Sequence, residues 1–406
     1  MYCRGKPGTG SKELDIVITG QNIICFSSDW CQDPLSKHHI ISRLSQSNRI
    51  LWINSIGLRT PTVSVKDASR VLAKLKSFFR GAQQINKNLF VISPVAIPFH
   101  GVSFFKPFNQ LLLWIQLFYY THKFKMTDCI IWSFLPNTGN LLGFFREKLS
   151  LYYITDDFTK FDGYPSETIE KAENELIDRC DCIIASAKEL ARKKQRSGKP
   201  VNVVNHGVNH AHFASALDIP ADRFPFDIKD IAHPVLGFYG ELNTWIDLPM
   251  IAEAAKKRLQ WSFVLIGRVA VEAGDIGFLQ KIPNIHLLGQ KKYEELPSYC
   301  AAFDAALIPM KINDLTICVN PLKLREYLAA GVPVISALLP EVKPYADVVK
   351  FASTADELIT AFEEIQKEER FKDKVTLSRR VENEGWDGKV EEISEIIQQA
   401  IVKKNG

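Results

Sequence analysis

The sequence lacks the cysteine patterns of metal sites and disulfide-stabilised folds. None of its eight cysteines belongs to a Cys-x-x-Cys pair, and none has the Cys and His spacing of a zinc site. Several stand inside apolar runs such as residues 180–186, where a free thiol behaves as a small hydrophobic side chain. We therefore expect no bound metal and a reducing compartment.

Long apolar runs are missing as well. The longest, residues 111–120, contains Gln116 and is far shorter than the roughly 20 residues that a membrane-spanning helix needs. The N-terminus has no apolar core of a signal peptide, and no internal repeat is visible. These absences predict a cytoplasmic protein without a transmembrane segment, and they exclude solenoids and propellers.

Charge of one sign is not in large excess over the whole chain. The formal net charge is +4, which is too small to indicate a nucleic-acid partner by itself. Hydrophobic residues make up 46% and charged residues 24%, as in ordinary soluble globular proteins. At about 100–200 residues per domain, the 406 residues predict two or three domains.

Short β-type runs alternate with helical ones, which is typical of βαβ units and a parallel sheet. The pattern stops in the Pro- and Asp-rich stretch 216–234 and then restarts. We therefore predict an α/β protein with two Rossmann-like domains facing each other across a cleft, followed by terminal helices. The predicted parts are a flexible tail (1–20), a first domain (21–213), a second domain (214–378) and the terminal helices (379–406).

The most informative segment is CVNPLKLREYLAAGVPVIS, residues 318–336. Asn320 and Pro321 lead into a helix whose first turn contains Lys323, a charge that the helix dipole disfavours there. A phosphate at the helix N-terminus would explain this cation. Glu326 follows three residues later and can accept hydrogen bonds from two ribose hydroxyls. The alternative is a solvated helix with an ordinary Lys–Glu pair.

Four segments in this order resemble the GT-B glycosyltransferases, in particular the family 4 (group 1) enzymes of bacterial polysaccharide synthesis. They are VVNHGVNHAHF (203–213), NIHLLGQKKYEELPSYCAAFDAALIPM (284–310), NPLKLREYLAAGVPVIS (320–336) and ENEGWDGKVEEI (382–393). The resemblance implies that Glu326 holds the nucleotide ribose and that the last segment crosses back to the N-terminal domain. It also implies that the first domain (21–213) binds the acceptor and the second domain (214–378) the donor. The implied donor site includes Asn320, Pro321, Tyr239, Gly240, Gly289 and Gln290.

The sequence departs from this family at two places. The family's E-x7-E motif would have its first glutamate at Cys318, and YGELNTWID has Glu241 and Asp247 where the family has an Arg and a Lys. Other residues must then meet the diphosphate charge. Lys323 is the first candidate and Arg268, after the strand FVLIG, is the second, with a plain surface cation as the alternative for Arg268.

Two aspartates follow a predicted strand in YYITDDFTKFDG, residues 152–163. Asp156 and Asp157 stand at the carboxyl end of the strand, where ligands bind in such sheets. One carboxyl with a raised pKa could take the proton from an acceptor hydroxyl, and we assign this catalytic role to Asp157. The segment resembles inverting GT-B glucuronosyltransferases with a catalytic aspartate. The alternative is that Asp157 only caps the next helical turn.

A second polar loop, residues 27–39, follows the first predicted strand. Asp29, Lys37 and His38 in this loop are candidates to orient acceptor hydroxyls, because a GT-B acceptor cleft would border it. Ordinary surface residues are the alternative.

Basic residues concentrate between residues 59 and 126, where ten of them stand against one acidic residue, Asp67. Within this region, residues 65–81 place apolar side chains on one helical face with basic residues around it. This pattern is typical of a helix that binds an anionic membrane surface, and a core-packed helix is the alternative. No nucleic-acid-binding motif accompanies the charges.

The sequence therefore predicts a glycosyltransferase that moves a sugar from a nucleotide-diphosphate sugar to a glycan acceptor in cell-surface polysaccharide synthesis. We expect this acceptor to be lipid-linked. It needs no cofactor beyond the donor. We expect it in the cytoplasm, peripheral on the inner face of the cytoplasmic membrane. The alternatives are a sugar-nucleotide epimerase with this architecture and a non-catalytic GT-B binding protein, and the stereochemistry of transfer is open.

Overall fold

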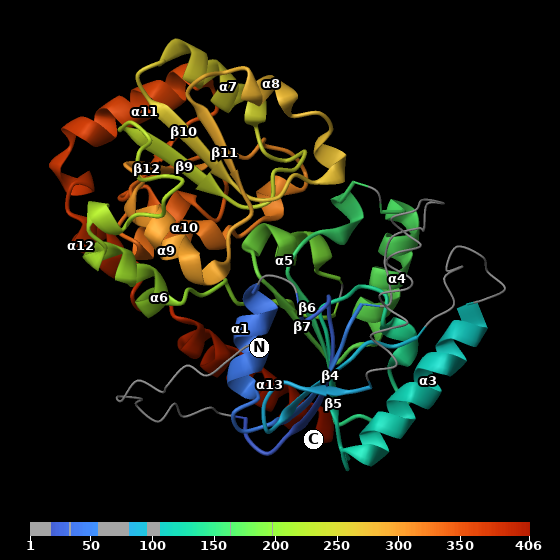
Figure 1. The fold of residues 1–406 in the computed structure, drawn as a ribbon. Helices are drawn as coiled ribbons and strands as arrows, with labels where there is room; N and C mark the ends of the chain where they lie inside the picture. The colour runs from blue at the N-terminus through green and yellow to red at the C-terminus, as the bar shows by residue number, and fades with distance from the viewer. Residues whose placement is uncertain (1–17, 32–33, 56–80, 96–105, 163, 197) are drawn as a thin grey trace.

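The computed structural model describes residues 18–31, 34–55, 81–95, 106–162, 164–196 and 198–406. Most of the predicted N-terminal tail and of the predicted helix 65–81 lies outside these residues. The described residues form two α/β domains, one above the other in Figure 1.

The N-terminal domain is built on an eight-stranded sheet in the order β3-β4-β2-β1-β5-β6-β7-β8. Neighbouring strands are parallel except for β3, which is antiparallel to β4. Its central strands are almost continuously apolar because helices cover both faces of the sheet. The strands are β1 (Asn22–Phe26), β2 (Arg49–Ile53), β3 (Gln83–Gln84), β4 (Leu89–Ile92), β5 (Ile130–Ser133), β6 (Leu149–Ile154), β7 (Cys182–Ala185) and β8 (Asn202–Val203). The described α-helices of this domain are α1 (Ser36–Leu44), α3 (Lys106–Lys123), α4 (Ser166–Arg179) and α5 (Lys188–Lys194).

The C-terminal domain has a six-stranded, all-parallel sheet in the order β11-β10-β9-β12-β13-β14. Its strands are β9 (Val235–Tyr239), β10 (Ser262–Ile266), β11 (Ile285–Gly289), β12 (Ala305–Ile308), β13 (Val334–Ser336) and β14 (Val349–Phe351). The helices that precede or surround it are α6 (His210–Ala214), α7 (Leu248–Lys257), α8 (Gly277–Gln280), α9 (Leu296–Ala301), α10 (Leu322–Ala329), α11 (Ala355–Lys367) and α12 (Lys374–Arg379).

The last helix, α13 (Trp386–Asn405), returns to the N-terminal domain, as the sequence predicts. Trp386, Val390, Ile393 and Ile397 are buried in one apolar cluster with residues of β1, β2, β5 and β6. The Trp386 ring also stacks on His39 of α1, with 5.1 Å between ring centroids. Burial of this apolar stripe holds the end of the chain on the first domain.

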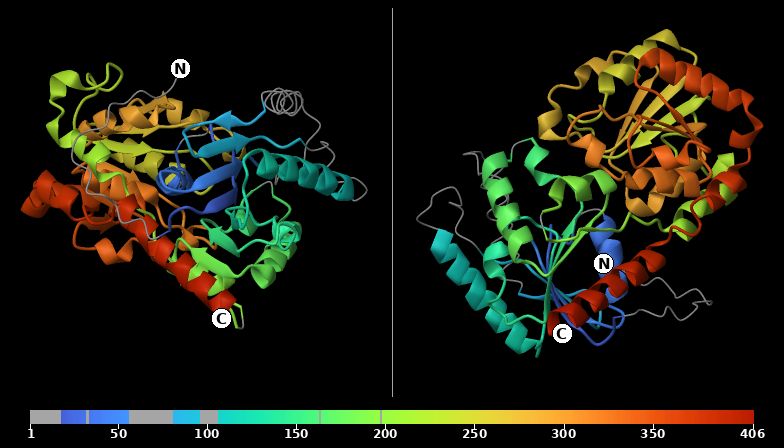
Figure 2. Two further views of the ribbon diagram at one scale, coloured as in Figure 1. Left: turned by 90° about the horizontal axis from the view of Figure 1, so that it is seen from below. Right: turned by 180° about the vertical axis from the view of Figure 1, so that it is seen from behind.

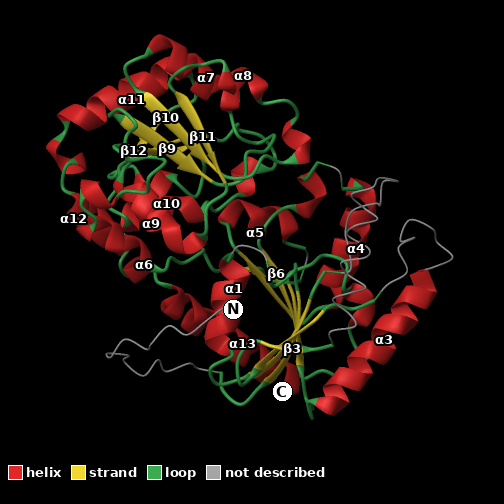
Figure 3. Cartoon of the chain, viewed as in Figure 1, coloured by secondary structure: helices red, strands yellow, loops and turns green. Residues whose placement is uncertain are grey.

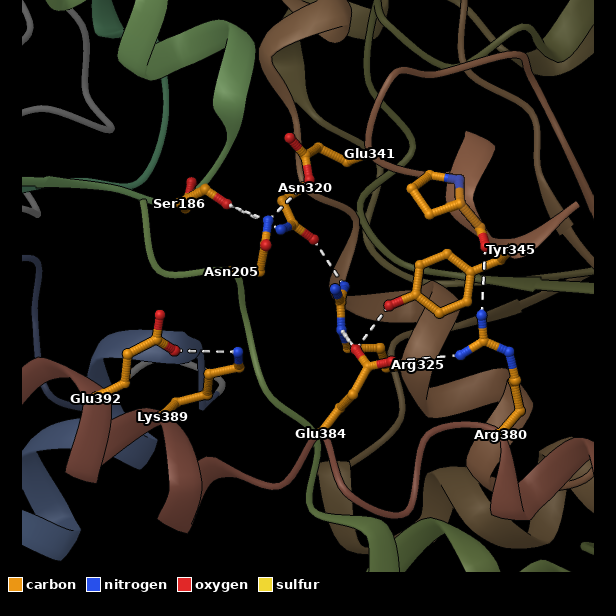
Figure 4. A network of polar contacts seen from close by, with 11 residues as sticks. Ser186, Asn205, Asn320, Arg325, Glu341, Tyr345, Arg380, Glu384, Lys389 and Glu392 are labelled. Atoms are coloured by element: carbon orange, nitrogen blue, oxygen red, sulfur yellow. Dashed lines mark hydrogen bonds and ion pairs between the residues drawn. The ribbon is translucent and has the colours of Figure 1, made fainter. Parts of the chain in front are cut away.

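Direct polar contacts also join the two domains, as Figure 4 shows. The Asn320 amide donates to the Ser186 carbonyl at 2.8 Å. The Glu341 carboxylate accepts from the Asn205 amide and from the Lys188 backbone N–H, both at 2.7 Å. Glu341 thereby supplies a cap from the C-terminal domain to α5, whose own N-cap residue makes no side-chain cap bond.

Candidate active site

The carboxyl ends of β9 and β10 meet the start of α10, and two glycines make this close approach possible. Gly240 has φ of 142°, and a Cβ there would lie 2.3 Å from Cε of Lys323. Gly267 has φ of 150°, and its Cβ would lie 1.8 Å from the Gly240 carbonyl oxygen. Any larger residue at either position would displace the Lys323 side chain or the loop.

Lys323 and Glu326 lie on the side of α10 that faces these strand ends. Burial lowers the pKa of Lys323, while the charges of Glu326 and Glu241 oppose this shift. Burial raises the pKa of Glu326, while a hydrogen bond from Tyr239 and the charge of Lys323 lower it by less. The Tyr239 hydroxyl donates to Glu326 at 2.6 Å, and the Tyr239 backbone N–H donates to the Tyr327 hydroxyl at 2.9 Å. The structure thus brings the predicted cation, carboxylate and tyrosine together at one helix N-terminus.

Asn320 uses its side chain for contacts within the protein. The buried amide donates to the Ser186 carbonyl of the other domain, and its oxygen accepts from Arg325 at 2.7 Å. The side chain is therefore occupied by contacts that join the domains, and the donor assignment of Asn320 stays a prediction. Pro321 is the extended N-cap residue immediately before α10.

Arg268 lies beside the site but is engaged elsewhere. Its side chain is 69% exposed and forms an ion pair of 2.8 Å with Glu241. Asp247, where the family has a cation, caps α7 by accepting from the Met250 N–H at 3.0 Å. Lys323 is therefore the better placed of the two predicted phosphate ligands.

Gly289 ends β11, and Gln290 lines a cavity of about 720 Å³. Other residues of its wall, Arg223, Phe226 and Lys292, were not singled out in the sequence because two of them come from the connection between the domains.

On the acceptor side, Asp157 has the environment of a structural carboxylate. Its Oδ1 accepts from Lys194 Nζ at 2.8 Å and from the Thr159 hydroxyl at 2.7 Å, and it caps the short helical turn Phe158–Lys160. Burial alone would raise the pKa of Asp157, but the bonds from Lys194 and Thr159 hold it below its usual value. The capping alternative therefore describes its contacts better than the catalytic one.

The neighbouring Asp156 has the opposite environment. Burial raises its pKa, against a hydrogen bond from Thr155 and the charge of Lys37. Burial also lowers the pKa of Lys37 to about 8, while Asp156, Cys25 and Asp29 favour its charged form. Asp156, Lys37 and Asp29 thus gather at the carboxyl ends of β1 and β6, and the carboxyl suited to take a proton is Asp156.

The same strand ends hold polar atoms that no described residue satisfies. The Ser27 and Ser28 hydroxyls and Oδ1 of Asp29 are buried without a hydrogen-bond partner in the described part of the chain. Buried polar atoms are normally paired, so these atoms are suited to bind hydroxyls of a ligand. The two serines were missed in the sequence because loop serines are common.

His38, a predicted acceptor-side residue, packs within the N-terminal domain instead. Its Nδ1 accepts from the Leu35 N–H at 3.0 Å, and its ring lies 5.0 Å from Trp30 and 5.3 Å from Trp52 between centroids. Burial lowers its pKa to about 4. It is a buried residue at the start of α1, but its Nε2 has no hydrogen-bond partner among the described residues, so its acceptor assignment stays a prediction.

The loops that follow β6 and β9 touch across the two domains. The Thr244 hydroxyl donates to Asp162 at 2.6 Å, and the Phe161 and Trp245 rings meet edge to face at 5.6 Å between centroids. These contacts set the donor and acceptor sides next to each other. Among the described residues, no cluster of His, Cys, Asp and Glu side chains can hold a metal ion.

Comparisons with known proteins agree with the glycosyltransferase resemblance of the sequence. Residues 233–368 match the family model of glycosyl transferases group 1. A Bacillus subtilis (strain 168) protein named as a teichuronic acid biosynthesis glycosyltransferase, TuaH, is 32% identical over 250 residues, which cover 58% of this chain and 55% of that protein. The chain thus spans about half the length of this relative.

Solved structures show the same fold at low identity. Anabaena HepE in complex with UDP and glucose has a TM-score of 0.62 at 12% identity, covering 93% of this chain and 99% of that one. The Escherichia coli trehalose-6-phosphate protein bound with UDP-2-fluoro glucose has a TM-score of 0.64 at 12% identity, with the same two coverages. The GT-B fold and the resemblance to group 1 glycosyltransferases are thereby confirmed.

Proposed function

We propose that this GT-B protein, whose residues 233–368 match the group 1 glycosyltransferases, moves a sugar from a nucleotide-diphosphate sugar to a glycan acceptor in polysaccharide synthesis. The observation that carries the proposal is the group of Lys323, Glu326, Tyr239 and Gly240 at the start of α10. A helix N-terminus with a cation suits a diphosphate, and a carboxylate one turn along suits a ribose.

In the proposed reaction the bond between the anomeric carbon and the diphosphate oxygen breaks, and the acceptor hydroxyl oxygen bonds to that carbon. Lys323 and the first amides of α10 stabilise the negative charge that develops on the leaving diphosphate. The acceptor proton goes to Asp156 if the configuration is inverted, or to the leaving phosphate if it is retained. No cofactor beyond the donor is required in this scheme.

The acceptor side is proposed to lie at the ends of β1 and β6. Ser27, Ser28 and Asp29 offer unpaired polar atoms there, beside Lys37 and Asp156. We further propose that the acceptor is lipid-linked and that the protein works at a membrane surface. The absence of acidic residues from 68 to 127, a stretch with eight Lys and Arg, supports this step.

The test begins with donor binding. A set of nucleoside-diphosphate sugars, UDP-glucose among them, is titrated against the protein by thermal shift and calorimetry. Lys323→Ala is expected to lower kcat/KM for transfer by about 10²–10³-fold, the scale of losing one group that stabilises developing negative charge. Arg268→Ala is the matched control, because this cation is exposed and paired with Glu241, and it is expected to change kcat/KM by about threefold or less.

Three outcomes would contradict the proposal. Equal kcat/KM in Lys323→Ala and wild type would remove this residue from the site. A donor that is converted without any acceptor would favour the epimerase. Donor binding without transfer or hydrolysis would favour the non-catalytic binding protein, for which the buried Cys318 in place of the family's glutamate is the supporting feature.

A further inference from the structure

Helix α3 carries an apolar face that the protein does not bury. Phe108, Leu111, Ile115, Phe118 and Tyr119 are each between 50% and 59% exposed. Their spacing of three and four residues places them on one side of the helix. Single exposed apolar residues are normal on a protein surface, whereas a continuous stripe of five marks an interaction surface.

The opposite side of α3 is an ordinary core face. Leu113, Leu117 and Tyr120 are buried in the apolar cluster that also contains residues of β1, β2, β5 and β6. The helix therefore packs on the N-terminal domain through its buried stripe, and its second apolar stripe stays exposed to solvent. Figures 1 and 2 show α3 along the outer edge of this domain, away from the C-terminal domain.

The sequence that precedes and forms α3 has charges of one sign. From residue 68 to residue 127 the sequence has no Asp or Glu and eight Lys and Arg. Lys123 ends α3, with its ammonium 5.7 Å from the centroid of the Tyr119 ring, and Lys125 follows. Apolar and aromatic side chains with flanking cations are the composition of a helix that lies in the interface of an anionic bilayer.

We propose that α3 is the membrane-docking face of this protein and that its occupant is an anionic lipid surface. The exposed stripe enters the region between headgroups and acyl chains, and Lys123 and Lys125 reach the anionic headgroups. No described helix is long and apolar enough to cross a membrane, so α3 lies on the bilayer.

The direction of α3 relates the proposed membrane contact to the candidate acceptor residues. The helix connects β4 to β5, so it runs opposite to the parallel strands and begins at the edge where the candidate acceptor residues lie. Its first exposed residues, Phe108 and Leu111, are therefore at the cleft end of the domain. The delivery of an acceptor to the cleft from the membrane rests on the proposed transfer to a lipid-linked acceptor, whereas the docking of α3 itself does not.

The test is co-sedimentation of the full chain with vesicles of phosphatidylcholine alone or mixed with phosphatidylglycerol. Wild type is expected to bind the mixed vesicles, with binding that weakens as salt is added. The combined variant Leu111→Glu, Ile115→Glu and Phe118→Glu is expected to bind at least about tenfold more weakly, because it removes apolar area and adds negative charge. Lys123→Glu with Lys125→Glu is expected to lose about fivefold or more per position.

The matched control changes two apolar residues of the C-terminal domain that are at least as exposed as the α3 stripe, Leu259→Glu and Val271→Glu, and should bind as wild type does. Circular dichroism and thermal unfolding confirm that each variant folds. Vesicle binding by the α3 variant equal to that of wild type would overturn the proposal. A wild-type dimer that dissociates in the α3 variant, without vesicle binding, would also overturn it and assign the face to a second copy.

Failure of this proposal can be told apart from failure of the proposed function. Donor binding measured by calorimetry depends on α10 in the other domain and needs no vesicles. A chain that binds a nucleotide sugar but not anionic vesicles would overturn only the docking face. A chain that binds vesicles through α3 but no nucleotide sugar would overturn only the transferase.

Discussion

Asp156 and Asp157 are neighbours in the chain with opposite electrostatic environments. Asp157 is held ionised by Lys194 and Thr159, whereas Asp156 lies half-buried near Lys37 with a raised pKa. The sequence predicts that one of the two has a raised pKa and assigns this role to Asp157, whereas in the fold the raised pKa belongs to Asp156. The difference comes from Lys194, which is 37 positions away and reaches Asp157 only in the fold.

The first prediction at this scale concerns the proton acceptor. Asp156→Asn is expected to lower the transfer rate by about 10²–10⁴-fold, the usual contribution of a general base, and to leave donor binding unchanged. In wild type the rate should fall as the pH drops through the raised pKa of Asp156, because the protonated carboxyl cannot accept a proton. A product of retained configuration with only a few-fold loss in Asp156→Asn would contradict this role.

Asp157→Asn is the matched control and should act on stability instead. The buried carboxylate loses its charge while Lys194 stays in place, so a loss of about 1–3 kcal/mol in the free energy of unfolding is expected. Because the folded-state pKa of Asp157 is lowered, its stabilisation is present above the unfolded pKa and disappears as the pH falls through the folded value. Acid unfolding of wild type and variant should therefore converge at low pH.

At the scale of elements, one side of α10 carries the candidate site residues, and another makes the contacts that join the domains. Lys323 and Glu326 face the strand ends, while Arg325 contacts Asn320 at 2.7 Å and forms an ion pair with Glu384 at 2.6 Å (Figure 4). The sequence predicts the helix and the pair Lys323 and Glu326 from local spacing. It does not predict the bond from Asn320 to the Ser186 carbonyl, because that partner is 134 positions away in another domain.

The prediction for this helix tests how Glu326 is positioned. Tyr239→Phe keeps the ring beside Tyr327 but removes the hydroxyl that donates to Glu326 at 2.6 Å. The pKa of Glu326 should rise further, and nucleotide binding measured by calorimetry should weaken by about fivefold to tenfold, more so at lower pH.

Tyr299→Phe is the control for this change. It removes a similar bond, from the Tyr299 hydroxyl to Asp227 at 2.8 Å, elsewhere in the same domain. Nucleotide binding should stay at the wild-type level. Equal weakening in both variants would show a general loss of stability rather than a role for Tyr239 at the ribose.

At the scale of the whole molecule, the two sheets and the returning helix were predictable, and the contact between the domains was not. Apolar periodicity indicates strands such as β1 and β9, and the stripe of α13 indicates a buried helix. Contacts such as Thr244 with Asp162 join loops of mixed polar residues, for which one sequence gives no pairing signal. For α3 the sequence shows a hydrophobic run interrupted by Gln116, but it does not show that one apolar face of the helix stays exposed.

The last prediction concerns Glu341, which joins the domains. Its carboxylate caps α5 through the Lys188 N–H and binds the Asn205 amide, and α5 ends at Lys194, the partner of Asp157. Glu341→Ala leaves the N-terminus of α5 without a side-chain cap and removes the partner of Asn205, so the free energy of unfolding should fall by about 1–3 kcal/mol. The exposed Glu382→Ala is the control and should unfold as wild type does.

Because Lys323 and Glu326 are not changed, nucleotide binding should persist in Glu341→Ala while transfer declines, since transfer requires both domains to be correctly placed. Wild-type stability and wild-type transfer in this variant would show that the domains are set by α13 and the loop contacts without Glu341.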